Sequence, residues 1–148
     1  MNDDWFEMLV ALLDADARFM VVGAHALAVH GVPRATQDLD VWIEPTPENA
    51  VRVWQALIAF GAPLAHLSVT TADLCQPGIV VQMGLPPNRI DLLTALSGLG
   101  DFASASQGQV QHVVRSRTIP FLGREALIVN KRAAGRLKDL ADVEAMGE

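Results

Sequence analysis

Residues 19–43 constrain the fold more than any other stretch of the chain. An apolar run meets a turn at Gly23, and a short helix of small residues follows. The chain then turns again and enters a second strand, in which apolar residues alternate with Asp38 and Asp40. A strand, a helix and a second strand in this order predict an α/β fold.

Asp38 and Asp40 are the first candidate site residues. Because the side chains of a strand alternate between its faces, the two carboxylates project from one face, roughly 6.5 Å apart along the strand. Such a pair attracts a hard divalent cation, Mg²⁺ or Mn²⁺, because these ions take oxygen ligands. The turn at Gly23 fits the same chemistry, because backbone N–H groups at a helix N-terminus bind anions. The sequence therefore predicts a site for a metal ion and a phosphate.

Three short segments resemble the motifs of the nucleotidyltransferase (DNA polymerase β-like) superfamily. In that family an apolar residue and Gly-Gly or Gly-Ser precede a short helix, an Asp-x-Asp or Asp-x-Glu motif follows, and a third carboxylate lies on a later strand. Here the segments are Val22-Gly23, Asp38-Leu39-Asp40 and Ile90-Asp91-Leu92. Ala24 departs from the pattern, because it offers only its backbone N–H where the family most often has Ser or Gly.

The stretches 30–40 and 130–144 are similar to a small bacterial branch of this family, which includes the nucleotidyltransferase-fold toxins of toxin–antitoxin systems. The resemblance implies a mixed, twisted β-sheet with helices packed mainly on one side. It also implies transfer of a nucleoside monophosphate from a nucleoside triphosphate, with ATP among the candidates, to an unidentified hydroxyl acceptor: RNA, protein or a small molecule. A cognate protein is a further expected partner.

The resemblance gives each candidate residue a role. Asp38 and Asp40 are expected to hold one or two Mg²⁺ or Mn²⁺ ions, and Asp91 to share the second ion and accept the proton of the acceptor hydroxyl. The residues expected to bind the nucleotide are Gly23, Ala24, Arg34, Thr36, Lys131 and Lys138. The first two offer backbone N–H groups, and the two lysines offer compact positive charges.

Other functions use the same residues. A non-catalytic module of this fold, which binds a partner protein without turnover, is favoured by Ala24. A metal-dependent phosphodiesterase would use the three aspartates with water as the acceptor. Structural roles also remain open: Asp91 can pair with Arg89 or cap a turn, and Lys138 can form a surface pair with Asp142, four residues later.

Composition excludes several classes of protein. The chain has 148 residues, 51% of them hydrophobic and 19% charged, which predicts one globular domain spanning 1–148. The lone Cys75 excludes an internal disulfide and a cysteine-rich zinc site. No apolar run reaches the ~20 residues that a membrane span needs, and Asp3 and Asp4 argue against a secretory signal. We therefore expect a cytoplasmic protein without a membrane partner.

The net charge of −6 is unevenly distributed. Residues 1–50 carry nine acidic and two basic side chains, whereas residues 115–138 carry seven basic side chains and one acidic one. This divides the predicted domain into an acidic metal-site half, 1–100, and a basic C-terminal segment, 101–148. The acidic total argues against a general nucleic-acid binder, whose affinity comes mainly from Lys and Arg contacts to phosphates.

Apolar periodicity predicts two amphipathic helices outside the central stretch. One spans 5–15, and the other spans 47–60 and ends at Gly61. The residues expected to face the core are Phe6, Leu9, Val10 and Leu13 in the first helix and Val51, Trp54, Leu57 and Ile58 in the second.

The remaining strands are predicted from apolar runs and turn residues. Residues 79–83 read as a buried strand, and the turn 84–88 joins it to a hairpin partner over 89–93. Residues 110–122 predict one or two strands, broken at Pro120.

A C-terminal helical region begins at Arg124, with a cap or kink near Asn130 and a second break at Gly135. Lys131 and Lys138 are seven residues apart, which places them about two turns apart on one side of a continuous helix. The predicted apolar stripe comprises Ala134, Leu137, Ala141 and Ala145.

Overall fold

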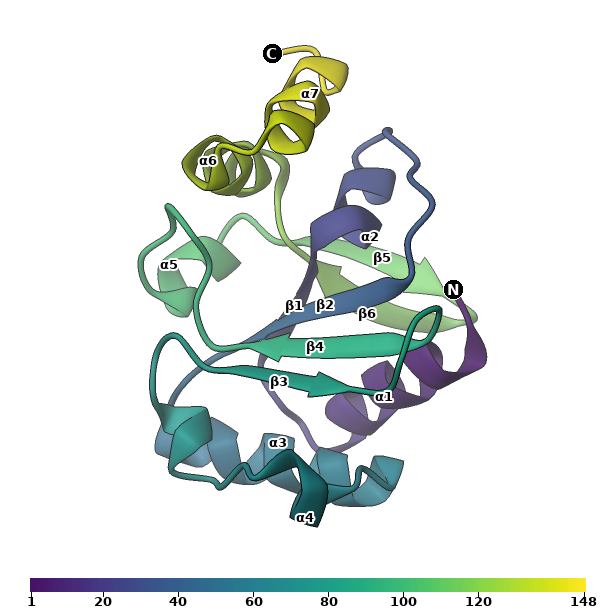
Figure 1. Cartoon of the computed structure of the whole chain (residues 1–148), viewed down its shortest axis with the longest axis vertical. Helices are drawn as coiled ribbons and strands as arrows, with labels where there is room; N and C mark the ends of the chain where they lie inside the picture. The colour runs from purple at the N-terminus through teal and green to yellow at the C-terminus, as the bar shows by residue number, and fades with distance from the viewer.

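The computed structural model describes every residue, 1–148, and places helices and strands in the order seen in Figure 1. The first half contains α1 (Asp3–Asp14), β1 (Phe19–Val22), α2 (Gly23–Val29), β2 (Asp38–Ile43), α3 (Pro47–Phe60), α4 (Leu64–Leu67) and the 3₁₀ turn η1 (Asp73–Cys75). The second half contains β3 (Val80–Met83), β4 (Arg89–Leu93), α5 (Phe102–Ser106), β5 (Val110–Val114), β6 (Arg117–Phe121), α6 (Arg124–Ala134) and α7 (Leu137–Ala145). The predicted strand–helix–strand opening is confirmed as β1, α2 and β2.

Six strands form one mixed sheet in the order β3-β4-β2-β1-β6-β5. β2 lies inside this sheet, antiparallel to β1 and parallel to β4. The register between β2 and β4 places Asp38 opposite Arg89, and Asp40 opposite Asp91. The predicted α/β fold is confirmed, and its sheet brings the candidate aspartates onto neighbouring strands.

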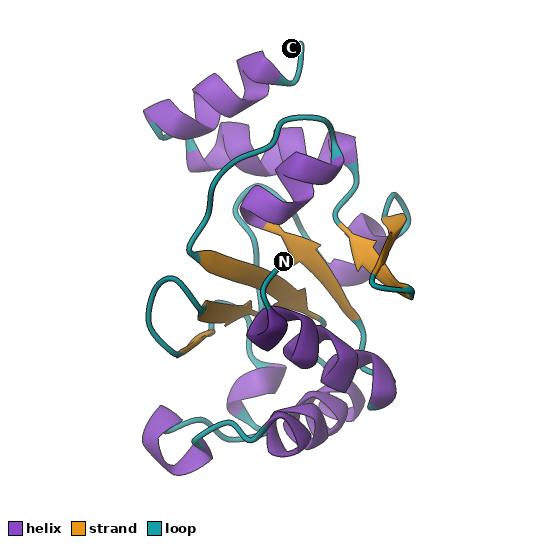
Figure 2. Ribbon diagram, turned by 90° about the vertical axis from the view of Figure 1, so that its right-hand side faces the viewer, coloured by secondary structure: helices purple, strands orange, loops and turns teal.

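The core is built on the apolar face of β2. Leu39, Val41 and Ile43 are fully buried and alternate with the two aspartates, as the period-2 pattern predicted. In Figure 1, α3 and α4 lie below the sheet, and α6 and α7 lie at the opposite end of the molecule. Figure 2 shows the strands between these lower helices and an upper group that ends at the C-terminus. No helix is both long enough and apolar enough to cross a membrane.

The buried faces predicted for the two amphipathic helices are partly wrong. Of the residues predicted to face the core from α1, only Leu9 is buried; the buried set is Trp5, Met8, Leu9 and Leu12. In α3, Val51 and Ile58 are 50% and 58% exposed, and the buried set is Asn49, Ala50, Val53, Ala56 and Leu57. α1 and α3 contact each other, so the partner helix helps to decide which stripe is buried. The end of α3 at Gly61, with φ 86°, is as predicted.

Two strand predictions also need correction. β3 is an edge strand, and Val80 is 52% exposed, so this run is not buried on both faces. Pro120 lies inside β6, and the turn between β5 and β6 falls at Arg115 and Ser116. Proline is tolerated there because β6 pairs with β1 only at Phe121, which leaves no ladder hydrogen bond for Pro120 to donate on that side.

The C-terminal region consists of two helices rather than one kinked helix. Gly135, with φ 68°, ends α6, which confirms the predicted break, whereas Asn130 lies within α6 and marks no cap or kink. The predicted stripe across this break is wrong: Leu137 is 87% exposed, and α7 buries Asp139, Asp142 and Val143. Buried aspartates in a helix require partners, and these partners lie at the candidate site.

Candidate active site

Three aspartates from neighbouring strands form a cluster. Asp38 and Asp40 lie on one face of β2, and Asp91 of β4 is the register partner of Asp40. Asp91 is only 6% exposed, and its Oδ1 has no hydrogen-bond partner. A buried carboxylate oxygen without a partner is costly unless a ligand or cation completes its surroundings. The structure therefore brings the three predicted aspartates together and leaves one of their oxygens unsatisfied.

Arg89 spans two of these aspartates. Its Nη2 lies 3.2 Å from Asp91 Oδ2 and 3.3 Å from Asp38 Oδ2, and its Nε lies 3.2 Å from Asp38 Oδ1. The pairing of Asp91 with Arg89, considered from the sequence as a structural role, is thus present, although Arg89 binds Asp38 as well. No group of three or more His, Cys, Asp or Glu side chains converges as metal ligands.

Burial and the neighbouring carboxylates raise the pKa of two of these groups, Asp40 and Asp91. The pKa of Asp40 is raised to about 6, first by burial and then by the charges of Asp91 and Asp38, while Arg89 opposes the shift. The pKa of Asp91 is also raised, mainly by burial, and Arg89 again opposes. A bound cation would favour the ionised forms, so metal binding and deprotonation are linked at this cluster.

The raised pKa of Asp40 predicts how the free energy of unfolding of the metal-free protein depends on pH. Because the pKa of Asp40 is higher in the folded state than its ordinary value of 3.8, the folded state binds more protons, and stability falls as pH rises through about 6. Asparagine does not ionise, so Asp40→Asn removes this fall in stability. Since one pKa unit corresponds to about 1.4 kcal/mol, the variant should gain on the order of 2–3 kcal/mol at pH 8 and little at pH 4.

Chemical denaturation in the presence of EDTA at the two pH values measures this difference. The matched control is Glu144→Gln, which neutralises an exposed carboxylate on α7 that makes no ion pair. Equal gains at pH 4 and pH 8, or no gain at either, would contradict the raised pKa of Asp40.

Gly23 lies directly against Asp40. Its φ is 66°, in the left-handed region, and a Cβ added to it would lie 2.5 Å from Asp40 Oδ2. The position thus requires glycine for two reasons, its backbone conformation and its contact with the carboxylate. α2 begins here, so the first N–H groups of that helix lie beside the aspartate cluster.

Comparing Gly23→Ala with Gly31→Ala separates the effect of backbone conformation from the effect of the contact with Asp40. Gly31 also has a positive φ, 95°, but a Cβ there would meet no atom within 4 Å. We expect Gly31→Ala to cost about 1–2 kcal/mol of stability through backbone strain alone. Gly23→Ala should cost more and should also weaken Mn²⁺ binding, because Asp40 must move. Denaturation curves and Mn²⁺ titration of both variants test this, and equal behaviour in both assays would contradict it.

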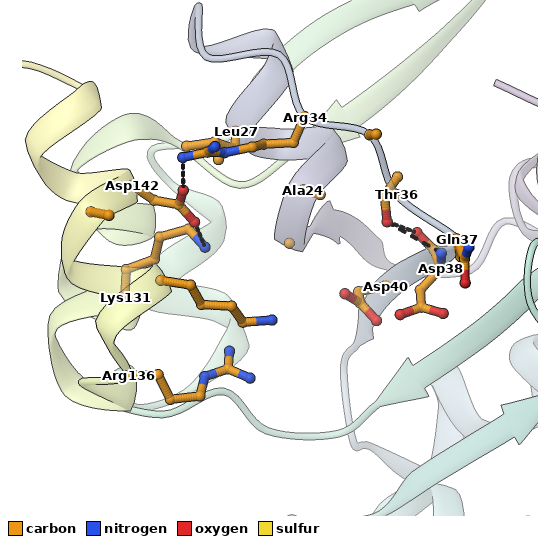
Figure 3. Close-up of a pocket in the computed structure, with 14 residues that line it drawn as sticks. Ala24, Leu27, Arg34, Thr36, Gln37, Asp38, Asp40, Lys131, Arg136 and Asp142 are labelled. Carbon is orange, nitrogen blue, oxygen red and sulfur yellow. Dashed lines mark hydrogen bonds and ion pairs between the residues drawn. The ribbon is translucent and has the colours of Figure 1, made fainter.

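A cleft of about 580 Å³ opens beside the cluster, between β2 and the two C-terminal helices. It is lined by eight of the nine predicted site residues: Gly23, Ala24, Arg34, Thr36, Asp38, Asp40, Lys131 and Lys138. Asp91 does not line it. Figure 3 shows Asp38 and Asp40 on one side, with Lys131 and Arg136 facing them from the helices. The sequence interpretation missed Arg136, although its place in the basic segment was a usable signal.

Ion pairs already hold most of the basic residues in this cleft. Lys131 Nζ lies 3.1 Å from Asp142 Oδ2 and 3.5 Å from Asp139 Oδ1, and Arg34 also pairs with Asp142. Arg136 Nε lies 2.6 Å from Asp139 Oδ2, an interaction that raises the pKa of Arg136. These pairs explain why α7 buries two aspartates and join both helices to the turn that carries Arg34.

Two predictions about the lysines are corrected by this arrangement. Lys131 and Lys138 belong to different helices, because Gly135 separates α6 from α7, yet both reach the cleft. Lys138 forms no ion pair with Asp142, which is bound to Lys131 and Arg34 instead. Lys138 is thus an exposed, unpaired cation at the cleft. The Thr36 hydroxyl is engaged by the backbone N–H and carbonyl of Asp38, so it shapes the turn as well as lining the cleft.

Comparison with solved structures identifies the architecture. Six chains of known structure match, among them a protein from Thermotoga maritima described as a "putative nucleotidyltransferase", with a TM-score of 0.57 and 14% sequence identity over 99% of this chain and 92% of that one. The protein has a nucleotidyltransferase-like fold. At this identity the likeness establishes the fold alone. No protein-family model matches the chain, and neither does any curated protein sequence.

Within this fold, the Asp38–Asp40 pair fits a hard divalent cation. Both residues supply carboxylate oxygens, the ligands that Mg²⁺ prefers, and both line the open cleft. Arg89 contacts Asp38 and Asp91 but forms no ion pair with Asp40. The residues that fit a cation therefore line the cleft, whereas Asp91, the register partner of Asp40 on β4, does not.

Proposed function

We propose that this protein is a metal-dependent nucleotidyltransferase, which transfers a nucleoside monophosphate from a nucleoside triphosphate to a hydroxyl acceptor. The observation that carries this proposal is the composition of one cleft, which Asp38 and Asp40 line together with Gly23, Arg136 and the unpaired Lys138. A triphosphate bound with a divalent cation needs this combination, since carboxylates bind the ion and the cationic side chains neutralise the phosphates.

Each predicted residue has a place in this proposal. Asp38 and Asp40 would hold Mg²⁺ or Mn²⁺, which when bound polarises the phosphate oxygens and orients the leaving group. The backbone N–H groups of Gly23 and Ala24 would hold the triphosphate tail, because the start of α2 is adjacent to the carboxylate pair. Lys138 would bind the outer phosphates. Arg34, Thr36 and Lys131 shape the cleft wall through the contacts described above.

In the proposed chemical step, Asp91 accepts the proton of the acceptor hydroxyl. The acceptor oxygen forms a bond to the α-phosphorus, the bond from that phosphorus to the α,β-bridging oxygen breaks, and pyrophosphate leaves. The acceptor proton goes to Asp91, whose pKa burial raises towards the range in which a carboxylate accepts protons effectively. Asp40 lies beside Asp91, so the proton acceptor is adjacent to the proposed metal ligands.

A second, smaller cleft offers a path for the acceptor. It has a volume of about 240 Å³ and is lined partly by Leu93, Ser97 and Asn130. Asp40 and Gly23 line both clefts. An acceptor in this cleft would reach Asp40, the register partner of Asp91.

Label transfer tests the proposal. The protein is incubated with each α-labelled nucleoside triphosphate, Mg²⁺ or Mn²⁺, and cell lysate, and label is then followed in protein, RNA and small-molecule fractions. We expect one fraction to acquire label, and its identity names the acceptor. Label in RNA or in a protein would accord with a role in a toxin–antitoxin system, and a cognate partner protein should then suppress the transfer. No label in any fraction would contradict the function.

The lysines provide a prediction about nucleotide binding. Lys138→Ala should raise the KM for the triphosphate about tenfold and leave stability unchanged, because an exposed charge that contacts phosphate is lost. Lys131→Ala should instead destabilise the fold by about 1–3 kcal/mol, because Asp139 and Asp142 lose a buried partner and keep only their arginines.

Steady-state kinetics and denaturation of both variants measure these effects. Arg132→Ala is the matched control, since Arg132 is exposed on α6 beside Lys131 and does not line the cleft. An unchanged KM in Lys138→Ala would exclude Lys138 from the phosphate site.

A non-catalytic module of the same fold is the second candidate. The observation that favours it is the internal pairing of Arg34 and Lys131 with Asp142, and of Arg136 with Asp139, which occupies three of the four cations that line the cleft. Such a module would bind a partner protein and transfer no label. A phosphodiesterase, the third candidate from the sequence, would release nucleoside monophosphate from a diester, and hydrolysis products in the same assay would reveal it.

A further inference from the structure

The guanidinium of Arg89 contacts two of the three aspartates. Three contacts of 3.2–3.3 Å join it to Asp38 and Asp91. Its side chain is 33% exposed, as is that of Asp38, whereas that of Asp91 is 9% exposed. A guanidinium is charged at all physiological pH values and spans two carboxylates as a planar fork. Arg89 therefore places one fixed positive charge between Asp38 and Asp91.

The backbone of Arg89 is held from two sides. Its N–H donates to the Gln37 carbonyl at 3.2 Å, and its carbonyl accepts from the Trp5 indole Nε1 at 3.1 Å. Trp5 is 5% exposed in the core, and Arg89 is the register partner of Asp38. The position of the arginine is thus built into the sheet.

The third aspartate is left free by this arrangement. Arg89 forms no ion pair with Asp40, whose Oδ2 faces Gly23 and which lines both clefts. Asp91 lines neither cleft, and its Oδ1 is buried without a partner. A cation that enters from the cleft therefore meets Asp38 and Asp40. The place between Asp38 and Asp91, where a second ion would bind, already holds the guanidinium.

We propose that Arg89 is a built-in substitute for a second metal ion, so that the protein takes up a single divalent cation, at Asp38 and Asp40, together with its nucleotide. This inference rests on the proposed function for the metal at Asp38 and Asp40. Arg89 is a positioning residue: it orients Asp91 through the bond at 3.2 Å and offsets one of the negative charges of the cluster before the metal arrives. Two ions placed ~3.5–4 Å apart would require the guanidinium to leave.

Counting bound Mn²⁺ tests this proposal without measuring turnover. Equilibrium dialysis with a non-hydrolysable triphosphate should give one Mn²⁺ per wild-type chain and two per chain in Arg89→Met, since the vacated carboxylates then accept an ion. Two adjacent Mn²⁺ ions interact magnetically, so the electron paramagnetic resonance spectrum should change in the variant alone. Arg89→Gln keeps hydrogen-bond donors without charge and serves as a second variant should Arg89→Met fold poorly; it should also bind two ions.

The matched control is Arg117→Met, which breaks a pair with Asp14 at 2.9 Å outside both clefts and should still bind one ion. Two ions in the wild type would overturn the role of Arg89 and leave the proposed function intact. One ion in wild type, Arg89→Met and Arg89→Gln alike would also overturn it. No bound ion in the wild type, even with nucleotide, would overturn both the inference and the proposed function.

Discussion

Asp40→Asn is expected to abolish nucleotidyl transfer while leaving the protein folded. The variant removes the charge of a proposed metal ligand that lines the cleft and conserves side-chain volume, so the sheet register with Asp91 should persist. Asp38→Asn should have the same effect on activity, because the two carboxylates act as one pair. We expect each substitution to weaken Mn²⁺ binding by at least ~10²-fold, since even residues that only support metal ligands cost 10–100-fold.

The two variants should differ in stability, which separates a loss of function from a loss of fold. Asp40→Asn should be more stable than the wild type at pH 8, for the reason given by its raised pKa. Asp38→Asn should gain less, because it loses an ion pair with Arg89. Calorimetric titration with Mn²⁺ gives the affinity, and an unchanged affinity in the double variant would exclude this pair as the metal site.

Asp91→Asn is expected to lose turnover and to keep nucleotide binding. Asp91 lines neither cleft, so a triphosphate docked beside Asp38 and Asp40 would have little contact with it. Loss of a positioned general base costs ~10²–10⁴-fold in rate. We expect a fall of this size in kcat, with nucleotide affinity within a few fold of wild type, the pattern of an interaction made mainly in the transition state.

Thr94, a buried polar residue directly after β4, provides the control for Asp91→Asn. Thr94 is 3% exposed and its Oγ1 accepts from the Ile79 N–H at 2.8 Å, so Thr94→Val should lower stability and leave kcat unchanged. Asp91→Asn that behaves like Thr94→Val, altered only in stability, would favour the non-catalytic module.

The fold was predictable where the signal is local. The alternation around Asp38 and Asp40 and the glycine turn at Gly23 each depend on a few consecutive residues, and the structure confirms both. The buried faces of α1 and α3 were less predictable, because each helix packs on the other as well as on the sheet. Val51 and Ile58 fit an apolar stripe as well as the buried residues do, and only the partner helix decides between them.

The site depends on contacts that the sequence does not encode locally. Arg89 and Asp38 are neighbours through parallel strand register, and Arg34 meets Asp142 across most of the chain length. The sequence suggested a pair between Lys138 and Asp142 at helical spacing, but the long-range partners of Asp142 prevail. Residue types and motif spacing thus predicted most of the residues that line the cleft. Which of these residues form ion pairs with one another is seen only in the folded structure.

Following the α- and γ-phosphates of the nucleotide separately tests whether the protein transfers a nucleoside monophosphate. The protein is supplied with the triphosphate and acceptor fraction selected by label transfer, labelled in parallel reactions at the α- and at the γ-phosphate, with Asp40→Asn as the inactive reference. Nucleotidyl transfer predicts that α-label joins the acceptor while γ-label leaves as pyrophosphate, in equal amounts and in the wild type alone. Transfer of γ-label to the acceptor, or equal transfer by Asp40→Asn, would contradict it.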